Sequence, residues 1–219
     1  MKRTFLFLLS LAAAATLWTG CCNGSDSLGK SMGRWKNFSV ESMTQSRIDG
    51  LEYIEVTMHD VIGKDTAGVR DRAALIKSQI DSSGLKIWSV HLPYSKKYDI
   101  SIVDSAKRAA VVNYIKDIAE VASVFQPKFV ILHPSYDNVA PDERGERLEN
   151  CHASIGQIAP IVEAYGATLC VENLPRTCLG RNGQEMMYLI SGYDKVGICF
   201  DVNHLIYQSH EDFLKSIDK

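Results

Sequence analysis

The sequence lacks an excess of basic residues. It contains 24 Lys and Arg against 26 Asp and Glu, which gives a formal net charge of −2 at pH 7. The basic residues are scattered along the chain rather than clustered. Proteins that attract nucleic acid or an acidic membrane through the phosphate charge usually carry a basic patch. We therefore expect no nucleic-acid partner.

The sequence also lacks a cysteine framework. Its six cysteines show neither a CxxC motif nor the spacing of a disulfide-stapled domain. Cys170 and Cys199 lie inside apolar runs, where a cysteine commonly packs as a small hydrophobic side chain. We predict that both belong to the core and that neither holds a metal.

A hydrophobic run long enough to cross a membrane is missing too. The apolar residues 5–18 follow Lys2 and Arg3 and are too few for a spanning helix, so we interpret residues 1–20 as a secretory signal. The letters LWTGCC resemble a bacterial lipoprotein signal. This resemblance implies cleavage before Cys21, a lipid on its thiol, and a protein anchored to the membrane of the cell envelope. Ordinary secretion is the alternative.

The remaining chain repeats one unit. Residues 21–34 are rich in small polar residues and predict a flexible tether, followed by a single domain over 35–219. In that domain, short apolar runs alternate with segments of helical period, which is typical of an α/β fold with a parallel sheet. Five runs are clear, and a weaker first strand is expected over 36–41. The clear runs span residues 50–58, 84–93, 127–135, 166–175 and 195–204.

Polar side chains close four of these runs: His91, His133, Glu172 and Asp201. Parallel strands point the same way, so residues at their carboxyl ends gather on one face. In a (β/α)₈ barrel that face carries the active site. We predict that the four side chains converge there and bind a metal.

Each of these residues also has a plainer interpretation. A single histidine at a strand end is more often a hydrogen-bonded structural residue, and Asp201 could cap the next helix. Glu172 follows three apolar residues, and a buried carboxylate needs a partner. That partner is a metal or an arginine such as Arg176, and we favour the metal. His204 lies one short turn after Asp201 and is expected in the same pocket. Nitrogen and oxygen ligands without thiolates suit Mn²⁺, Mg²⁺, Zn²⁺ or Co²⁺.

The segments VHLP, ILHPS, CVENLPR and CFDVNH, in this order, resemble the xylose isomerase-like (β/α)₈ superfamily. The similarity covers residues 36–219. That group includes sugar and sugar-phosphate isomerases and epimerases as well as endonuclease IV. The resemblance implies that Glu172 binds the metal and acts as an acid/base, and that Asp201 is a second ligand. It places His204 at the substrate, and we also expect Arg176 to contact the substrate. In the endonuclease branch, residues at the positions of His91 and His133 bind an additional zinc.

The family's seventh and eighth strands have no counterpart in this sequence. We therefore expect an incomplete barrel of about six βα units, not competent alone and prone to aggregate at its open edges. The leading hypothesis is a metal-dependent isomerase or epimerase of a sugar or sugar phosphate that acts through an enediolate. One alternative is a metal-dependent phosphodiester hydrolase, and another is a lipoprotein that binds sugars without turnover.

Overall fold

The computed structural model describes residues 27–218. The predicted signal peptide and the predicted lipidation residue, Cys21, lie outside the described residues. Within residues 27–218, every helix is too short or too polar to cross a membrane.

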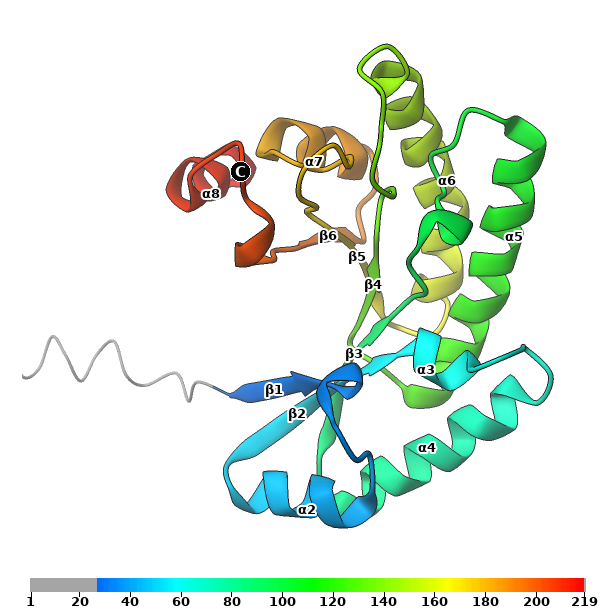
Figure 1. Cartoon of the computed structure of the whole chain (residues 1–219), viewed down its shortest axis with the longest axis vertical. Helices are drawn as coiled ribbons and strands as arrows, with labels where there is room; N and C mark the ends of the chain where they lie inside the picture. Colours follow the sequence, from blue (N-terminus) through cyan, green and yellow to red (C-terminus); the bar gives the residue numbers. More distant parts are fainter. Residues whose placement is uncertain (1–26, 219) are drawn as a thin grey trace, which may run out of the picture.

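Six strands form one sheet, in which every pair of neighbours is parallel and the strand order follows the chain. The strands are β1 (Leu28–Ser31), β2 (Leu51–Thr57), β3 (Lys86–His91), β4 (Phe129–Leu132), β5 (Thr168–Glu172) and β6 (Val196–Cys199). The sheet curves like part of a barrel wall and does not close, with β1 and β6 at its edges (Figure 1). The predicted α/β fold with an incomplete barrel is confirmed.

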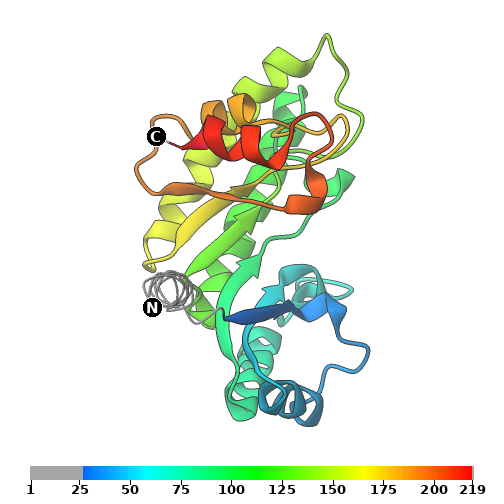
Figure 2. The same cartoon turned by 90° about the vertical axis from the view of Figure 1, so that its left-hand side faces the viewer.

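Helices connect the strands and cover the outer face of the sheet (Figures 1 and 2). The α-helices are α2 (Val40–Ile48), α3 (Met58–Ile62), α4 (Val69–Ser83), α5 (Ser105–Ala122), α6 (Arg144–Glu163), α7 (Gly183–Ile190) and α8 (His210–Ile217). The 3₁₀ helices are η1 (Met32–Arg34), η2 (Lys96–Tyr98), η3 (Ser123–Phe125) and η4 (Val202–His204). Each predicted strand after the first therefore has its helix.

Helix α5 shows how the sequence forms these covering elements. It begins where the Asp104 side chain accepts a hydrogen bond from the Lys107 N–H at 3.0 Å. Its buried residues Val112, Ile115 and Ile118 recur every three residues, which places them on one face. That face packs into the core between the sheet and the neighbouring helices.

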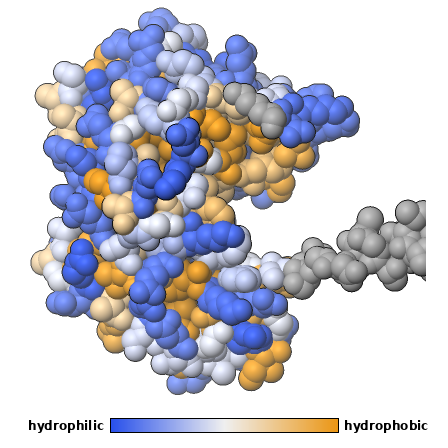
Figure 3. Space-filling view, turned by 180° about the vertical axis from the view of Figure 1, so that it is seen from behind, coloured by the Kyte–Doolittle hydropathy of each residue, from blue (hydrophilic) through white to orange (hydrophobic). Residues whose placement is uncertain are grey.

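Alternate residues of each strand point to opposite faces of the sheet. One set is buried under the helices, including Val56, Val90 and Val130. A hollow of about 300 Å³ opens on the inner face, lined by Glu55, Trp88, Ser89, Phe129, Ile131, Cys170, Ile198 and Cys199. Figure 3 shows the molecule hollowed on this side, with hydrophobic residues on the upper wall. Cys170 is buried as predicted, whereas Cys199 is only half-buried.

The start of the domain differs from the prediction. The first strand is Leu28–Ser31, not residues 36–41, and it pairs with β2. The tether predicted over 21–34 is therefore wrong from Leu28 onward. Residues 36–41 instead lead into α2, because Ser39 and Ser42 cap its first turn reciprocally, each side chain accepting from the other residue's N–H at 3.3 Å.

Candidate metal centre

Three neighbouring strands bring His91, His133 and Glu172 together. His91 ends β3, His133 follows β4, and Glu172 ends β5. The Oε2 atom of Glu172 lies 3.1 Å from Nε2 of His91 and 3.0 Å from Nε2 of His133. The convergence expected from the strand ends is present at the carboxyl edge of the sheet.

A second group shares the same carboxylate. The Oε1 atom of Glu172 lies 3.4 Å from Nδ1 of His204, which lies 3.6 Å from Oδ2 of Asp201. Asp201 also caps η4, since its Oδ1 accepts a hydrogen bond from the Asn203 N–H at 2.7 Å. One oxygen of Asp201 therefore caps the 3₁₀ helix and the other faces the cluster, while its binding of a metal stays a prediction.

Burial and pairing set the charges of the first group. Burial raises the pKa of the Glu172 carboxyl, but hydrogen bonds from His133 and His91 outweigh burial and hold that pKa well below its ordinary range. Burial lowers the pKa of His91, but the hydrogen bond and charge of Glu172 outweigh it, so this pKa is raised. For His133 burial dominates, and its pKa is lowered. Glu172 is thus ionised, and of the two imidazoles in this group His91 more readily carries a compensating proton.

The donor atoms fit a divalent ion. Nδ1 of His91 lies 2.8 Å from the carbonyl oxygen of Leu92, which assigns a proton to Nδ1. In a neutral ring, Nε2 is then an acceptor that faces another acceptor, Oε2 of Glu172. Two acceptors repel each other at this distance, so a proton or a cation must lie between them. An imidazole whose other nitrogen donates to a backbone carbonyl is typical of metal ligands.

The distances agree with this assignment. Ligand atoms bound about 2.0–2.2 Å from one ion lie about 2.8–3.6 Å from each other in tetrahedral or octahedral sites. The separations of 3.1 and 3.0 Å between Oε2 of Glu172 and Nε2 of His91 and of His133 fall in that span. His204 differs from the others, because its Nδ1 also lies 2.9 Å from the carbonyl oxygen of Asn173. Its Nε2 therefore stays available for a ligand.

Arg176 does not neutralise Glu172. Its exposed guanidinium pairs with Asp137, with Nε 2.5 Å from Oδ2. The backbone of Arg176 has φ 54°, in the left-handed region, which turns the chain sharply after β5. The predicted contact of Arg176 with substrate stays a prediction.

Comparison with known proteins assigns the family. Residues 46–218 match the family described as xylose isomerase-like TIM barrel. The chain belongs to this family. An uncharacterized protein of Methanocaldococcus jannaschii is 28% identical over 120 residues, which are 52% of this chain and 41% of the relative. The chain thus spans less than half the length of that curated relative.

Solved structures share the fold at low identity. A D-psicose 3-epimerase, crystallised in the presence of D-fructose, superposes with a TM-score of 0.73 at 19% identity, over 87% of this chain and 69% of the epimerase chain. An L-ribulose 3-epimerase gives a TM-score of 0.64 at 21% identity, over 81% and 61% of the two chains. These likenesses show that the xylose isomerase-like fold extends over most of the chain.

Asn173 was missed by the sequence analysis. Asn173 is fully buried, and its side chain makes two hydrogen bonds to the backbone of Asp201. The amide nitrogen donates to the Asp201 carbonyl at 3.0 Å, and the amide oxygen accepts from the Asp201 N–H at 2.7 Å. Asn173 therefore fixes the end of β6 against the end of β5. The sequence feature that could have indicated Asn173 is that it is a second polar residue, directly after Glu172, at the end of an apolar run.

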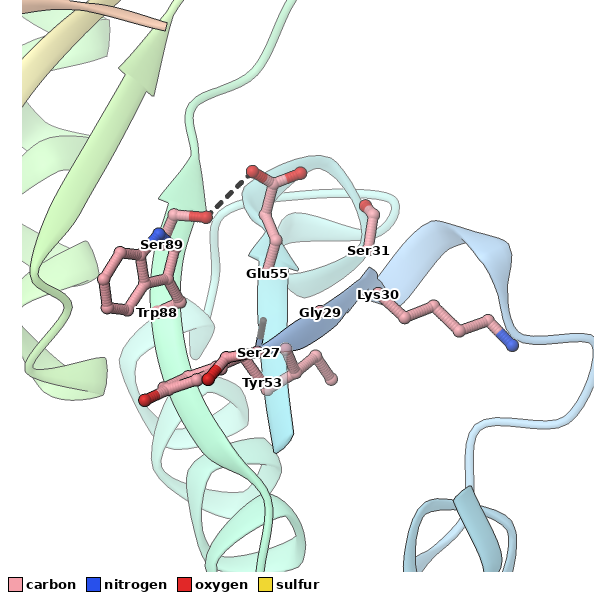
Figure 4. Close-up of a pocket in the computed structure, with 9 residues that line it drawn as sticks. Ser27, Gly29, Lys30, Ser31, Tyr53, Glu55, Trp88 and Ser89 are labelled. Carbon is pink, nitrogen blue, oxygen red and sulfur yellow. Dashed lines mark hydrogen bonds between the residues drawn. The ribbon is translucent and has the colours of Figure 1, made fainter. Parts of the chain in front are cut away.

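Glu55 was missed as well. It lies on the inner face of β2 and accepts a hydrogen bond from the Ser89 hydroxyl at 2.9 Å (Figure 4). Together with His91, Glu172 and Asp201 it lines a pocket of about 280 Å³. Tyr53 and Trp88 continue the wall beside it into a larger hollow of about 480 Å³. The sequence feature that could have indicated Glu55 is an acidic residue inside the apolar run LEYIEVT.

Proposed function

We propose that this member of the xylose isomerase-like family is a divalent-metal-dependent isomerase or epimerase of a sugar or sugar phosphate. The observation that carries the proposal is the position of Glu172, whose two carboxylate oxygens each face one group of imidazole or carboxylate ligands. The epimerase activity named for the two solved structures supports the substrate class. Because the chain spans 69% of one epimerase and 61% of the other, the activity of a whole enzyme is part of the proposal.

His91, His133, Glu172 and Asp201 would hold the ion. When bound, the ion supplies positive charge that stabilises negative charge developing on substrate oxygens. Glu172 removes the proton from the carbon beside the substrate carbonyl, which produces an enediolate. A second acid on the opposite side of the substrate must protonate the other face of that carbon to give the epimer, whereas return of the proton by Glu172 to the neighbouring carbon gives the isomer. A hydride shift between the two carbons is the alternative route.

The pKa of Glu172 and the position of His204 both suit the site to this step. Its depressed pKa keeps the carboxylate ionised and ready to accept a proton at neutral pH. The same depression makes it a weak base, so the substrate carbon must be acidified by the positive charge beside its carbonyl. The Nε2 atom of His204 is free to bind a substrate hydroxyl, since Nδ1 is held by the Asn173 carbonyl.

A second candidate is metal-dependent hydrolysis of a phosphodiester. The observation that favours it is that two groups share Glu172, so that His91, His133 and Glu172 could hold one ion while Glu172 and Asp201 hold another. The net charge of −2 does not favour a polyanionic nucleic acid as substrate.

The test is deuterium exchange, because exchange of one C–H proton needs only a single base. The full chain is loaded with Mn²⁺, Co²⁺ or Mg²⁺ in D₂O and offered ketopentoses, ketohexoses and their phosphates. We expect NMR to show loss of the hydrogen beside the carbonyl, abolished by a chelator and by Glu172→Gln. Product without deuterium would indicate the hydride shift. Hydrolysis of bis(p-nitrophenyl) phosphate without exchange of any sugar would favour the second candidate and overturn the first.

A further inference from the structure

Tyr94 packs on both histidines of the first group. Its ring centroid lies 4.5 Å from that of His133, with the planes nearly parallel at 28°, and 4.9 Å from that of His91, at 57°. The two imidazole rings lie 4.9 Å from each other. The three rings therefore form a closed triangle in which each contacts the other two.

The loop after β3 holds Tyr94 in this position. The N–H of Leu92 donates to the Ile131 carbonyl at 2.9 Å, which extends the pairing of β3 with β4 by one residue. Leu92 is buried and its carbonyl orients His91. Pro93 then fixes the backbone immediately before Tyr94.

Exposure divides the cluster into two halves. The side chains of His91 and His133 are 10% and 16% exposed, whereas Tyr94 itself is 48% exposed. Tyr94 is thus the outer member of the triangle. In the second group, the side chains of His204 and Asp201 are 26% and 31% exposed. Glu172, at 7%, lies between a covered half and an open half.

We propose that Tyr94 is a positioning residue that caps the covered half of the cluster, which consists of His91 and His133. Its ring face holds the imidazoles of His91 and His133 directed at Glu172 and shields them from water. Ligands then enter from the half formed by Asp201 and His204. Tyr94 covers the two imidazoles whether or not a metal is bound. Only the effect of Tyr94 on ion affinity rests on the proposed function.

The ring, not the hydroxyl, performs this role, because the contacts are between ring faces and edges. Tyr94→Phe keeps these contacts and Tyr94→Ala removes them. Tyr136→Ala is the matched control, since Tyr136 is similarly exposed at 41% and uses its backbone N–H to bond Asp99. If circular dichroism shows that the alanine variant does not fold, Tyr94→Leu replaces it, because leucine keeps bulk without an aromatic face.

The decisive measurement uses metal-free protein. Diethyl pyrocarbonate modifies accessible imidazoles, and mass spectrometry reports each histidine separately. In wild type, Tyr94→Phe and Tyr136→Ala we expect His91 and His133 to react more slowly than His204. In Tyr94→Ala their rates should rise toward the rate of His204, because the ring that covers them is gone, while the rate of His204 is unchanged. Unchanged rates for His91 and His133 in Tyr94→Ala would overturn the cap, and so would a matching rise in Tyr94→Phe.

A second measurement addresses the consequence. Cobalt titrated into each variant should bind about 10–100-fold more weakly to Tyr94→Ala than to wild type, and equally well to Tyr94→Phe. Equal affinity of Tyr94→Ala and wild type would overturn the positioning role. Failure of wild type to bind cobalt would remove the proposed function, yet the modification rates would still decide whether Tyr94 caps the two histidines.

Discussion

His133 and Glu172 come from adjacent strands, and their side chains meet with Nε2 of one 3.0 Å from Oε2 of the other. The Glu172 side chain is 7% exposed, so water screens this contact poorly. Because the other carboxylate oxygen faces His204, Glu172 joins the ends of β4 and β5 to the turn after β6. Glu172 thus links both groups of possible ion ligands found within residues 27–218.

Glu172→Gln should weaken ion binding more than any other single change in the cluster. The amide keeps the shape of the side chain but loses the charge that both ligand groups share. Cobalt affinity, measured by absorbance titration, should fall by more than the roughly 10–100-fold that loss of an outer partner costs. The control is Glu211→Gln, a change on a side chain that is 76% exposed in α8. Equal affinity of Glu172→Gln and wild type would remove Glu172 from the site.

Asn173→Ala should lower both stability and ion affinity. The change leaves the N–H and carbonyl of Asp201 without the two hydrogen bonds that the amide supplies. The Asp201 N–H then has no partner, whereas the carbonyl keeps the His204 N–H at 3.3 Å, so stability should fall by about 1–3 kcal/mol in urea denaturation of the metal-free chain. Cobalt affinity should fall about 10–100-fold because Asp201 loses its orientation. A loss of stability with unchanged affinity would show that Asn173 holds the fold but not the ligand.

The site could be predicted largely because parallel strands impose a common direction. His91, His133, Glu172 and Asp201 each close an apolar run, and a parallel sheet gathers such ends without further information. Side-chain contacts between units could not be predicted in this way. Asn173 acts on the backbone of Asp201, and nothing in the spacing of the two residues specifies that orientation.

The first strand could not be predicted from local preference. The letters LGKS of β1 include no β-branched or aromatic residue, so pairing with β2 rather than propensity makes this segment a strand. The segment 36–41 carries apolar residues at alternate positions, Phe38 and Val40, which favoured a strand. The segment instead leads into a helix, because the Ser39 side chain caps α2.

The metal-free chain should lose stability in acid through Glu172. The pKa of this carboxyl lies below its usual 4.5 in the folded state, so its ionisation stabilises the fold above that pH. The contribution is lost as the pH falls through the lower, folded value. The free energy of unfolding of wild type should therefore drop more steeply than that of Glu172→Gln between about pH 4.5 and pH 3.

Chemical denaturation with urea at several pH values measures this difference. His91 acts in the opposite sense, because its pKa is raised above 6.5 and its contribution fades as the pH rises past that value. The comparison with Glu172→Gln is therefore made below pH 4.5, where the contribution of His91 no longer changes with pH. Parallel curves for the two chains in acid would contradict the assignment of this transition to Glu172.

The N-terminal prediction can be tested separately. Expressed with its own N-terminus in a bacterium, the chain should fractionate with membranes and incorporate labelled palmitate at Cys21. Cys21→Ser should abolish the label, and Cys22→Ser, one residue further along, should keep it. A cleaved, unlabelled protein in the soluble exported fraction would support ordinary secretion instead.

Asp99 and Arg147 form a buried ion pair that should dominate the stability of the loop carrying Tyr94. Nη2 of Arg147, in α6, lies 2.5 Å from Oδ2 of Asp99, and their side chains are 8% and 5% exposed. Asp99 also accepts hydrogen bonds from Ser101, and from the N–H of Tyr136 at 3.1 Å. Asp99→Ala leaves a charged guanidinium buried without its partner, which should cost about 3–5 kcal/mol in urea denaturation.

The double variant Asp99→Leu with Arg147→Leu separates pairing from burial. Removing both charges leaves no unpaired ion, and apolar replacement of a buried pair is often close to neutral. We therefore expect the double variant to be more stable than Asp99→Ala. If its loss instead equalled the sum of the losses of Asp99→Leu and Arg147→Leu measured singly, the two residues would be energetically independent. The loop would then be held to α6 by its other contacts, among them the hydrogen bond from the Ser154 hydroxyl to the Ile100 carbonyl.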